Sequence, residues 1–330
     1  MPVFEIKKQD EWPEQEEFLQ SYTYGEFLIS LSKKVLRLCI QVGEEKIYVQ
    51  AVEHIMFRFI TFLYIPRMYI APIFFEKLVQ YAKKKNYTFI RLEPSQQMNL
   101  SSVKLQEVKN RQPQYTWILD INKTTEQLLQ EMHSKTRYNI RVAEKKEVYI
   151  DHVKNLDVFL KLNETTTERN KFISHPRQYI EKLLSLSDVF QFNAYIDKTP
   201  VASAIILRHQ KSFIYLLGAS SNEYRNAMSP YLLHWDIINT GKKEGIDTYD
   251  FWGIAPPAKK ENVGTVCFHT YCFEDIHPLS GVSRFKAGWG GAVKSYPQAY
   301  EIIINPLTYI IVKFIYALRG RNRIVGHPDN

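Results

Sequence analysis

Two parts of the chain show the same order of hydrophobic patterns. In the first, residues 46–66 ("KIYVQAVEHIMFRFITFLYIP") are rich in the β-branched and aromatic side chains that are typical of strands. Residues 74–86 ("FFEKLVQYAKKKN") repeat apolar positions three and four apart, which predicts a helix. Residues 87–94 ("YTFIRLEP") then predict a strand.

The second part repeats this order of strands, helix and strand. Residues 190–221 predict three strands joined by two polar turns. Residues 229–245 predict a helix with Ser229 as its N-cap, and residues 247–253 predict the next strand. We therefore expect two similarly built α/β domains that meet near residue 148.

The connector between the two parts predicts one long basic helix over residues 124–146. Thr124 and Gln127 have the spacing of a capping box. Arg137 and Arg141 share a face, where their like charges repel and a bound anion would relieve the repulsion. Phosphate binding and a solvated helix face both fit this pattern. The basic residues of the second half are Lys135, Arg137, Arg141, Lys145 and Lys146.

The composition and net charge of the chain indicate which class of partner it binds. Among 330 residues, 45% are hydrophobic and 24% are charged, which is typical of a globular chain with a sizeable core. The formal net charge of +8 favours anionic partners, namely phosphates, nucleic acid or an anionic membrane surface. A solvated basic surface without a ligand is the alternative.

Cysteine usage and the N-terminus indicate a cytoplasmic protein. Cys39, Cys267 and Cys272 are too few and too scattered for a disulfide framework or a zinc site, so we expect reduced thiols. The polar, acidic residues 1–18 resemble neither a signal peptide nor a transit peptide.

A polar loop before the helix at residue 229 is a candidate anion site. Arg225 precedes the helix N-terminus, where free N–H groups and the helix dipole attract anions. Acyl-CoA N-acyltransferases of the GNAT type place a glycine-rich pyrophosphate loop here. Met228 and Pro230 occupy the glycine positions, so the CoA site is expected to be lost. A merely structural role for Arg225 is the alternative.

Two further motifs carry candidate chemistry. In "YDFWGI", Asp250 is placed to orient a cation or an amine, unless Tyr249 and its neighbours form only a packed strand. In "SRFKAGWGG" (residues 283–291), Lys286 lies between Phe285 and two glycines, which predicts an electropositive loop. Such a lysine faces phosphate or stabilises an oxyanion. A glycine-rich turn that closes a sheet is the alternative.

The stretch of residues 304–323 ("INPLTYIIVKFIYALRGRNR") predicts a last helix. Its apolar run is too short to span a bilayer and Lys313 interrupts it. It fits either a buried helix, which we favour, or a helix on a membrane surface with Arg319, Arg321 and Arg323 at lipid headgroups.

Taken in order, these motifs resemble the FemABX family of peptidoglycan interpeptide-bridge peptidyltransferases, in the compact form without a coiled-coil arm. The resemblance implies an α/β (α+β) chain of two GNAT-like acyltransferase domains, over residues 1–147 and 148–300. It also implies that residues 301–330 return to pack on the first domain. The motifs that carry it are "YTYGEF", "YIPR", "RLEP", "TWILDI", "KTRYNIRVAEKK", "TTTERNKF", "LLGASSNEYRNAMSPYLLHWDII", "YDFWGI" and "RFKAGWGG".

The resemblance implies transfer of an amino acid from aminoacyl-tRNA to an amine on the stem peptide of a peptidoglycan precursor, linked to UDP or to lipid. The reaction is aminolysis of an ester, so it needs no metal and no cofactor besides aminoacyl-tRNA as co-substrate. We expect a cytoplasmic monomer, with peripheral contact with the inner face of the plasma membrane left open. An acyl-CoA-dependent N-acyltransferase and a non-catalytic RNA- or membrane-binding protein are the alternatives.

Residue by residue, the family's motifs make Lys286 and Phe285 the candidates for the acyl-transfer centre. Arg225 matches the arginine that grips the precursor diphosphate, and Tyr249 lies in a strand near the precursor. A basic residue expected near the first motif is replaced by Glu26. The full set of candidate substrate-binding residues is Arg225, Tyr249, Asp250, Arg67, Arg137 and Arg141.

Overall fold

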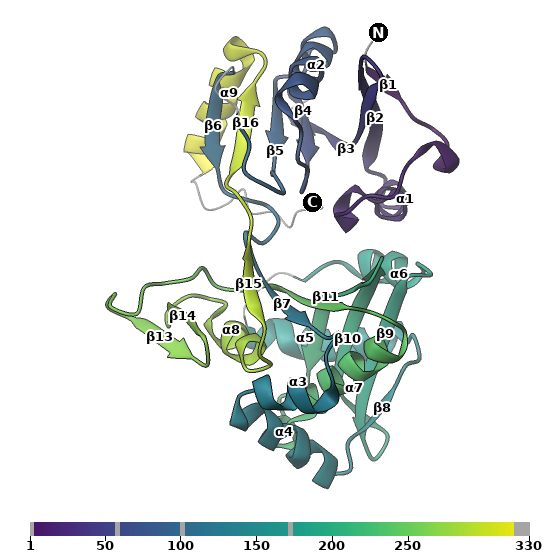
Figure 1. Ribbon diagram of the computed structural model, residues 1–330, viewed down its shortest axis with the longest axis vertical. Helices are drawn as coiled ribbons and strands as arrows, with labels where there is room; N and C mark the ends of the chain where they lie inside the picture. Colours follow the sequence, from purple (N-terminus) through teal and green to yellow (C-terminus); the bar gives the residue numbers. More distant parts are fainter. Residues whose placement is uncertain (1–2, 57–59, 100–102, 171–173, 320–330) are drawn as a thin grey trace. The chain divides into compact units, whose positions relative to one another are not determined.

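The computed structural model describes residues 3–56, 60–99, 103–170 and 174–319. Its contacts divide the chain into two units (Figure 1). The first unit takes Met1–Gln114 and Tyr296–Asn330, and the second takes Tyr115–Ser295. Each unit contains one large sheet with helices packed on it.

The predicted division at residues 147 and 148 is wrong, because β7 (Tyr115–Asp120) pairs with strands of the second unit. It runs antiparallel to β12 (Thr248–Gly253) and to β15 (Ala292–Ser295). The connector over residues 124–146 follows β7 and belongs to the same unit. The chain re-enters the first unit at Tyr296.

The sheet of the first unit joins strands from both ends of the sequence. Its order is β1-β2-β3-β4-β5-β16-β6, with β4 and β5 parallel and the other neighbours antiparallel. Strand β16 thus lies between β5 and β6 (Figure 1). In sheet order, the bounds are Val3–Glu5, Lys34–Val42, Glu45–Met56, Ile60–Ile65, Phe89–Leu92, Ala299–Ile303 and Leu105–Val108.

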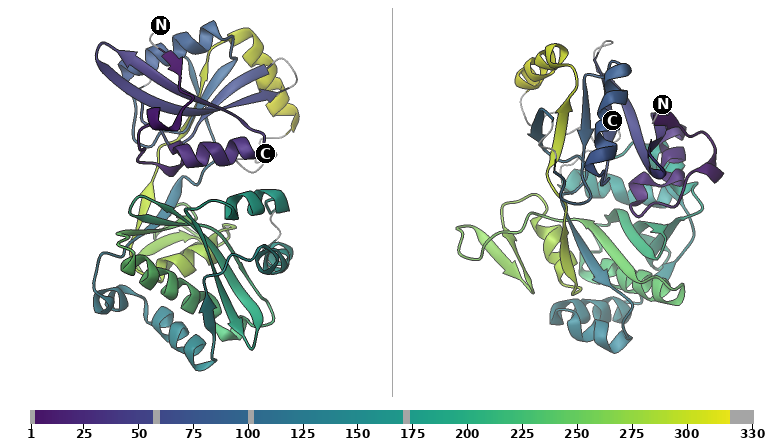
Figure 2. Two further views of the ribbon diagram at one scale, coloured as in Figure 1. Left: turned by 90° about the vertical axis from the view of Figure 1, so that its right-hand side faces the viewer. Right: turned by 45° about the horizontal axis from the view of Figure 1, so that its top comes forward.

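Helices cover both faces of this sheet. Helix α2 (Pro72–Lys84) buries Leu78 against a core cluster that includes Ile90 of β5. Helix α1 (Tyr22–Ser30) lies on the opposite face (Figure 2). Because side chains alternate along a strand, Phe89 points away from α2 and its ring contacts Tyr309.

Helix α9 (Pro306–Arg319) carries Tyr309 and is the last described element. The 3% exposure of Tyr309 and the 0% exposure of Val312 show that one face of α9 is docked on the first unit. The predictions for Arg321 and Arg323 lie outside the described residues. None of the helices in the described ranges is both long enough and apolar enough to cross a membrane.

The sheet of the second unit has the order β15-β7-β12-β11-β10-β9-β8. Strands β11 and β12 are parallel, but they pair only from Ser212 to Ile214 against Thr248 to Asp250. Beyond these residues the two strands lose their pairing. The remaining bounds are Ser212–Ser220 for β11, Thr199–His209 for β10, Val189–Ile196 for β9 and Tyr149–Asp151 for β8.

The connector forms two helices instead of the one predicted. Helix α3 (Thr125–Glu131) begins with the predicted capping box, in which both reciprocal bonds form. The chain turns at His133, whose Nδ1 accepts a bond of 3.1 Å from the N–H of Lys135 and caps α4 (Ser134–Lys145). The cap at His133 starts a new helix because its side chain satisfies a free N–H.

The other helices of this unit also carry candidate residues. Helix α7 begins at Ser229, so its N-cap is Met228 rather than the predicted Ser229. Met228 has a positive φ of 54°. The bounds are Leu156–Asn170 for α5, Arg177–Leu184 for α6, Ser229–Lys243 for α7 and Ser280–Ala287 for α8.

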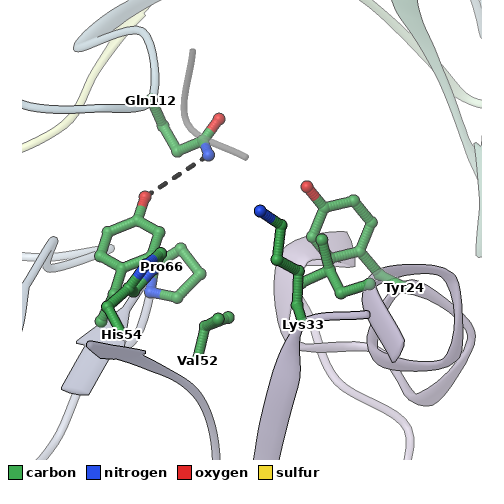
Figure 3. A pocket seen from close by; sticks show the side chains of 8 residues that line it. Tyr24, Lys33, Val52, His54, Pro66 and Gln112 are labelled. Carbon is green, nitrogen blue, oxygen red and sulfur yellow. Dashed lines mark hydrogen bonds between the residues drawn. The ribbon is translucent and has the colours of Figure 1, made fainter. Parts of the chain in front are cut away.

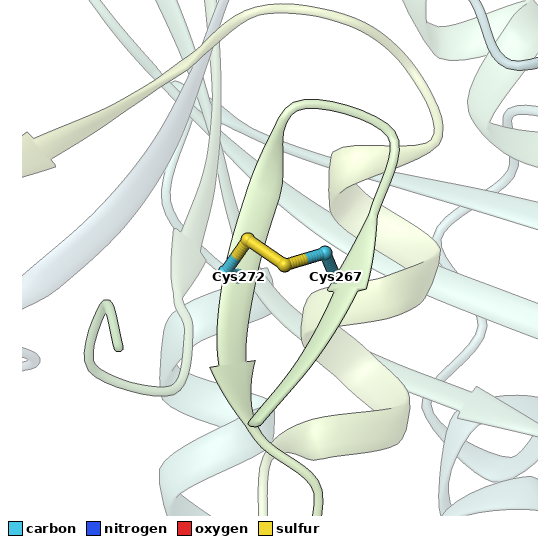
Figure 4. Close-up of a disulfide and its surroundings, with 2 residues drawn as sticks. All are labelled: Cys267 and Cys272. Atoms are coloured by element: carbon cyan, nitrogen blue, oxygen red, sulfur yellow. A yellow bond between two sulfur atoms is a disulfide. The ribbon is translucent and has the colours of Figure 1, made fainter. Parts of the chain in front are cut away.

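A disulfide corrects the expectation of three reduced thiols. Strands β13 (Thr265–Phe268) and β14 (Tyr271–Glu274) form a hairpin in which Cys267 lies opposite Cys272. The two residues form a disulfide across this pair (Figure 4). The two cysteines are only 5 residues apart in sequence, and their pairing depends on the register of the hairpin, which the sequence analysis did not predict. Cys39 is a buried free thiol.

Candidate functional site

Lys286 lies on a helix, not in the loop that the sequence predicted. It occupies the last turn of α8 and is only 5% exposed. Ser283, one turn earlier on the same face, is also buried. A lysine is almost never buried to this degree unless its ammonium has a partner.

The glycines after α8 are required by packing. Gly291 has a φ of +86°, and a Cβ there would lie 2.3 Å from the carbonyl oxygen of Ile118. A Cβ on Gly290 would lie 3.1 Å from the carbonyl oxygen of Glu131. Trp117 fixes the turn by donating from Nε1 to the Gly290 oxygen at 2.7 Å. For these glycines, the interpretation as a turn that closes a sheet is the better one.

The partner of Lys286 is the carbonyl of Gly253 at the end of β12. Its Nζ donates to that oxygen at 2.7 Å. The register of β12 shifts between Asp250 and Gly253, and Trp252 has a positive φ of 64°. Asp250 supports this bulge, because its Oδ1 accepts from the N–H of Trp252 at 2.7 Å. The bulge re-aims the strand end toward α8.

Burial changes the acidity of this lysine. Loss of solvent lowers the pKa of Lys286 from its ordinary value of 10.5 to about 7, and the negative charge of Asp250 partly opposes that shift. Near neutral pH the group therefore exists as both ammonium and amine. A buried ammonium is a strong donor toward a developing negative charge.

His234 and Tyr215, which the sequence did not single out, lie around this lysine together with the predicted Tyr249. His234 on α7 is buried, and its Nδ1 lies 2.7 Å from the hydroxyl of Tyr249. Burial, and then the charge of Lys286, lower the pKa of His234 to about 3, so the imidazole is neutral at physiological pH. Tyr215 of β11 places its ring centroid 5.7 Å from the Lys286 ammonium.

The packing of Tyr215 explains a glycine in β11. A Cβ on Gly218 would lie 1.6 Å from the Tyr215 hydroxyl oxygen, so only glycine leaves room for this side chain. Burial raises the pKa of Tyr215 to about 12. The lysine thus lies against a neutral phenol and near a neutral imidazole, at the place where β11 and β12 lose their pairing.

Phe285 precedes the lysine in α8, and no described interaction joins its ring to the Lys286 ammonium. Its ring centroid lies 5.0 Å from that of Tyr231 and 5.2 Å from that of His234. The ring centroid of Trp289 lies 6.1 Å from that of Phe285 and completes the aromatic group. These rings gather beside α8, where burial favours the neutral form of Lys286.

Tyr249 is fully buried, which favours the packed-strand interpretation for this residue. Its burial, followed by the charges of Tyr215 and Asp250, raises the pKa of its phenol well above the usual value. Tyr249 therefore acts on the site through His234, which it holds in place.

Arg225 is exposed on the short helical turn before α7, and its side chain forms no hydrogen bond or ion pair with a described residue. The first turn of α7 has fewer free N–H groups than the sequence predicted. Pro230 has no N–H, and the N–H of Tyr231 donates to the Met228 oxygen at 2.9 Å. The start of α7 therefore offers fewer free backbone donors than the sequence predicted, beside the exposed guanidinium of Arg225.

Arg137 and Arg141 have different environments. Arg137 donates from Nη1 to the carbonyl oxygens of Leu129, at 2.9 Å, and of Met132. These carbonyls belong to the end of α3, so Arg137 is a C-terminal cap of that helix. The side chain of Arg141 is exposed and has no partner within the described ranges.

Arg67, the remaining candidate, lies in the first unit and is only 2% exposed. Its Nη2 donates to the carbonyl oxygen of Pro113, and its Cζ lies 3.1 Å from the ring centroid of Tyr296. These contacts tie three distant segments of the first unit together. The burial of Arg67 favours a structural role over direct substrate contact.

The first unit also contains a small pocket on the face opposite α2 (Figure 3). Lys33 points into it, and Gln112 donates to the Tyr64 hydroxyl at 3.4 Å. Burial, and then the charges of Arg111, Lys33 and Arg91, lower the pKa of His54 to about 3. The pocket is lined by Tyr24, Leu28, Lys33, Val52, His54, Tyr64, Pro66 and Gln112.

The surroundings of this pocket show which basic residue lies near the first motif, where the sequence has Glu26. Glu26 forms an ion pair with Arg37 at 2.8 Å, and Lys34 forms one with Glu53 at 2.6 Å. The side chain of Lys33 forms neither an ion pair nor a hydrogen bond with a described residue. Sequence proximity to "YTYGEF" was the only signal for Lys33.

The ammonium of Lys286 can stabilise an oxyanion, and the side chains of Arg225 and Lys33 can each bind an anion. Nowhere in the described ranges do three or more His, Cys, Asp or Glu residues gather as metal ligands. The chemistry that fits this set is acyl transfer from an already activated donor.

Comparison with known proteins identifies the family. The model of the FemAB family matches residues 103–196 and 189–317, and the chain belongs to this family. The crystal structure of FemX superposes with a TM-score of 0.75 at 17% identity, over 95% of this chain and 100% of that chain. The predicted α/β class is confirmed, because two large sheets with helices make up the chain and its fold matches that of FemX.

Curated relatives match only parts of their length. The lipid II:glycine glycyltransferase of Staphylococcus saprophyticus is 24% identical over 190 residues, which cover 58% of this chain and 38% of that protein. The aminoacyltransferase FemB of Staphylococcus epidermidis is 26% identical over 141 residues, which cover 43% and 30%. The match thus spans less than two-fifths of either relative.

Proposed function

We propose that the protein is an aminoacyltransferase that transfers an amino acid from aminoacyl-tRNA to an amine on the stem peptide of a peptidoglycan precursor. The observation that carries the proposal is the buried Lys286 at the unpaired ends of β11 and β12, in a member of the FemAB family. The names of the glycyltransferase and aminoacyltransferase relatives support the same class of reaction.

In the proposed reaction, the amine nitrogen of the precursor attacks the carbonyl carbon of the aminoacyl ester. The carbonyl oxygen takes up negative charge, and the ammonium of Lys286 stabilises it. The ester C–O bond then breaks, an amide remains, and the terminal ribose oxygen of the tRNA takes up the proton that the amine loses. The ester is already activated, so no protein nucleophile is needed.

One cation is proposed to bind the precursor. The guanidinium of Arg225 is exposed and has no described partner, which suits a bidentate bond to a diphosphate. Whether the precursor is linked to UDP or to lipid decides what else this group contacts.

The tRNA is proposed to contact the exposed face of α4. Arg141, Lys145 and Lys146 are exposed there, whereas Arg137 is committed to the end of α3. Lysine and arginine contacts with phosphates give affinity without reading sequence. These substrates belong to the cytoplasm, which is where we propose that the protein acts.

The start of α7 argues against the alternative of an acyl-CoA-dependent N-acyltransferase. Met228 and Pro230 replace the glycines of a pyrophosphate loop, and the chain uses the Tyr231 N–H internally. A non-catalytic RNA-binding protein has no use for a buried lysine whose pKa is near 7.

The test is a transfer assay with the purified full chain. A pool of charged tRNAs is incubated with UDP-linked or lipid-linked precursor, and the precursor mass is read by mass spectrometry. The proposal expects one added aminoacyl mass, and its loss in Lys286→Ala. Transfer from acetyl-CoA under the same conditions, or no transfer with a folded protein, would contradict it.

A further inference from the structure

Helix α9 presents two opposite faces with different roles. On one face, the Tyr309 hydroxyl donates to Glu301 at 2.6 Å and the Tyr316 hydroxyl donates to the same carboxylate at 2.9 Å. Glu301 is fully buried and lies 3.4 Å from Nη1 of Arg91. These bonds hold α9 on the surface of the first unit.

The other face of α9 is an exposed apolar stripe. The side chains of Leu307, Ile310, Ile311 and Phe314 are 79%, 63%, 40% and 63% exposed. Their spacing of three and four residues places them on one side of the helix. Large apolar side chains gathered in this way on a soluble surface mark an interaction site.

The charge along this part of the chain selects among the partners. From Ile302 to Arg319 the sequence has two basic residues, Lys313 and Arg319, and no acidic residue. Lys313 is exposed beside the stripe, and its ammonium lies 5.9 Å from the ring centroid of Tyr309. Its flexible stem allows the ammonium to turn toward a headgroup. The whole chain carries a formal net charge of +8.

We propose that the stripe of α9, defined by Leu307, Ile310, Ile311 and Phe314, docks the protein on an anionic lipid bilayer surface. The apolar side chains enter the boundary between headgroups and acyl chains, and Lys313 faces the lipid phosphates. Tyr309, Val312 and Tyr316 stay bound to the protein, so the helix lies in the interface and does not cross it.

Two other occupants fit less well. A second copy of the chain would bring a second Lys313 and a second strongly positive chain to the same apolar contact. A nucleic acid would use the positive charge but would leave the four apolar side chains in water. An anionic bilayer satisfies both components of the surface.

The experiment measures partition of the full chain onto vesicles by sedimentation. Vesicles of phosphatidylglycerol and phosphatidylcholine are compared with vesicles of phosphatidylcholine alone. We expect binding to the anionic vesicles that weakens at high salt. Ile310→Ser with Phe314→Ser should weaken this binding at least tenfold, because both side chains lose apolar area that enters the bilayer. Lys313→Gln should weaken it about fivefold.

Matched controls separate the stripe from general effects. Ile55→Ser with Val263→Ser removes apolar side chains that are 66% and 102% exposed outside α9, and it should leave vesicle binding unchanged. Thermal melts check that each variant is folded. A Phe314→Trp variant reports insertion directly through a blue shift of its fluorescence on anionic vesicles.

Four results would overturn the proposal. They are no binding of the wild-type chain, equal binding to neutral vesicles, equal binding of the Ile310 and Phe314 variant, and an apolar self-association that depends on the stripe without vesicle binding. None of these readouts requires transfer activity, so the docking surface and the enzymatic proposal fail or stand separately.

Discussion

The ammonium of Lys286 lies 2.7 Å from the carbonyl oxygen of Gly253 and joins the last turn of α8 to the bulged end of β12. This bond keeps the lysine at the point where β11 and β12 lose their pairing. The same ammonium is the group proposed to stabilise the oxyanion. The hydrogen bond that packs α8 against β12 therefore also positions the ammonium that is proposed to stabilise the oxyanion.

Removing the ammonium should lower turnover with little change in the affinity for the precursor. We expect Lys286→Ala and Lys286→Met to reduce turnover about 10²–10³-fold, because one donor to the oxyanion is lost. Methionine keeps the apolar stem, so it serves as the control for packing. Steady-state kinetics on both variants measure the effect. Normal turnover in the folded Met variant would remove Lys286 from the mechanism.

The pH profile should separate Lys286 from an arginine in its place. The pKa of Lys286 is about 7, so the ammonium is lost as pH rises through that value. An arginine stays charged throughout, although its planar group fits the site less well. We expect the ratio of wild-type turnover to Lys286→Arg turnover to fall between pH 6 and 9. A ratio that is constant over this range would show that the ammonium form is not the active one.

The stability of the wild-type protein should rise with pH relative to Lys286→Met. Between about pH 7 and 10.5, the unfolded chain binds a proton at Lys286 that the folded chain does not hold. The free energy of unfolding then rises by up to about 1.4 kcal/mol per pH unit more than in the variant. Below pH 7 both states are protonated and the burial penalty is fully present. Urea melts at several pH values give the slopes, and identical slopes would disprove the shift.

Arg225 should matter for the precursor and not for the fold. A charged hydrogen bond contributes about 1.5–3 kcal/mol, so Arg225→Ala should weaken precursor binding about tenfold or more. Arg177→Ala is the control, because Arg177 is also exposed in the second unit and forms a surface ion pair with Asp157. Calorimetry with the precursor compares the two variants. Equal affinities in both would argue against a diphosphate contact.

The two arginines of α4 should respond differently to truncation. Arg137→Ala removes the cap of α3, so it should lower stability by about 1 kcal/mol. Arg141→Ala should leave the melting temperature unchanged and reduce the salt dependence of tRNA affinity by about one phosphate contact. Thermal melts and binding titrations at several salt concentrations measure both. The reverse assignment of effects would contradict the structure.

Local patterns predicted the regular elements well. The strands around residues 46–66 and 190–221 and the helix from residue 229 follow from periodicity and turn residues, which act over a few positions. The capping box at Thr124 and Gln127 was predicted for the same reason and forms as expected. The break at His133 was missed, because a histidine cap competes weakly with a continuous helical pattern.

Non-local contacts decided what the sequence did not reveal. Gly291 avoids the Ile118 carbonyl, which is far away in sequence, so a ligand-facing loop and a packed turn read alike. His234 of α7 and Tyr249 of β12 meet only because α7 folds back on the sheet that contains β12. The boundary before Tyr115 depends on which sheet accepts β7, and no local pattern specifies that choice.

Because β16 lies between β5 and β6, the sheet of the first unit can be completed only late in synthesis. The ribosome completes residues 115–295 before it makes Ala299–Ile303, so the second unit has all its strands while the first sheet still lacks an interior one. Until then, β5 presents an open edge, and β6 has no neighbour to pair with. The earlier unit in the sequence is thus the later one to finish folding, and its nascent form is the stage at which wrong pairing threatens this chain most.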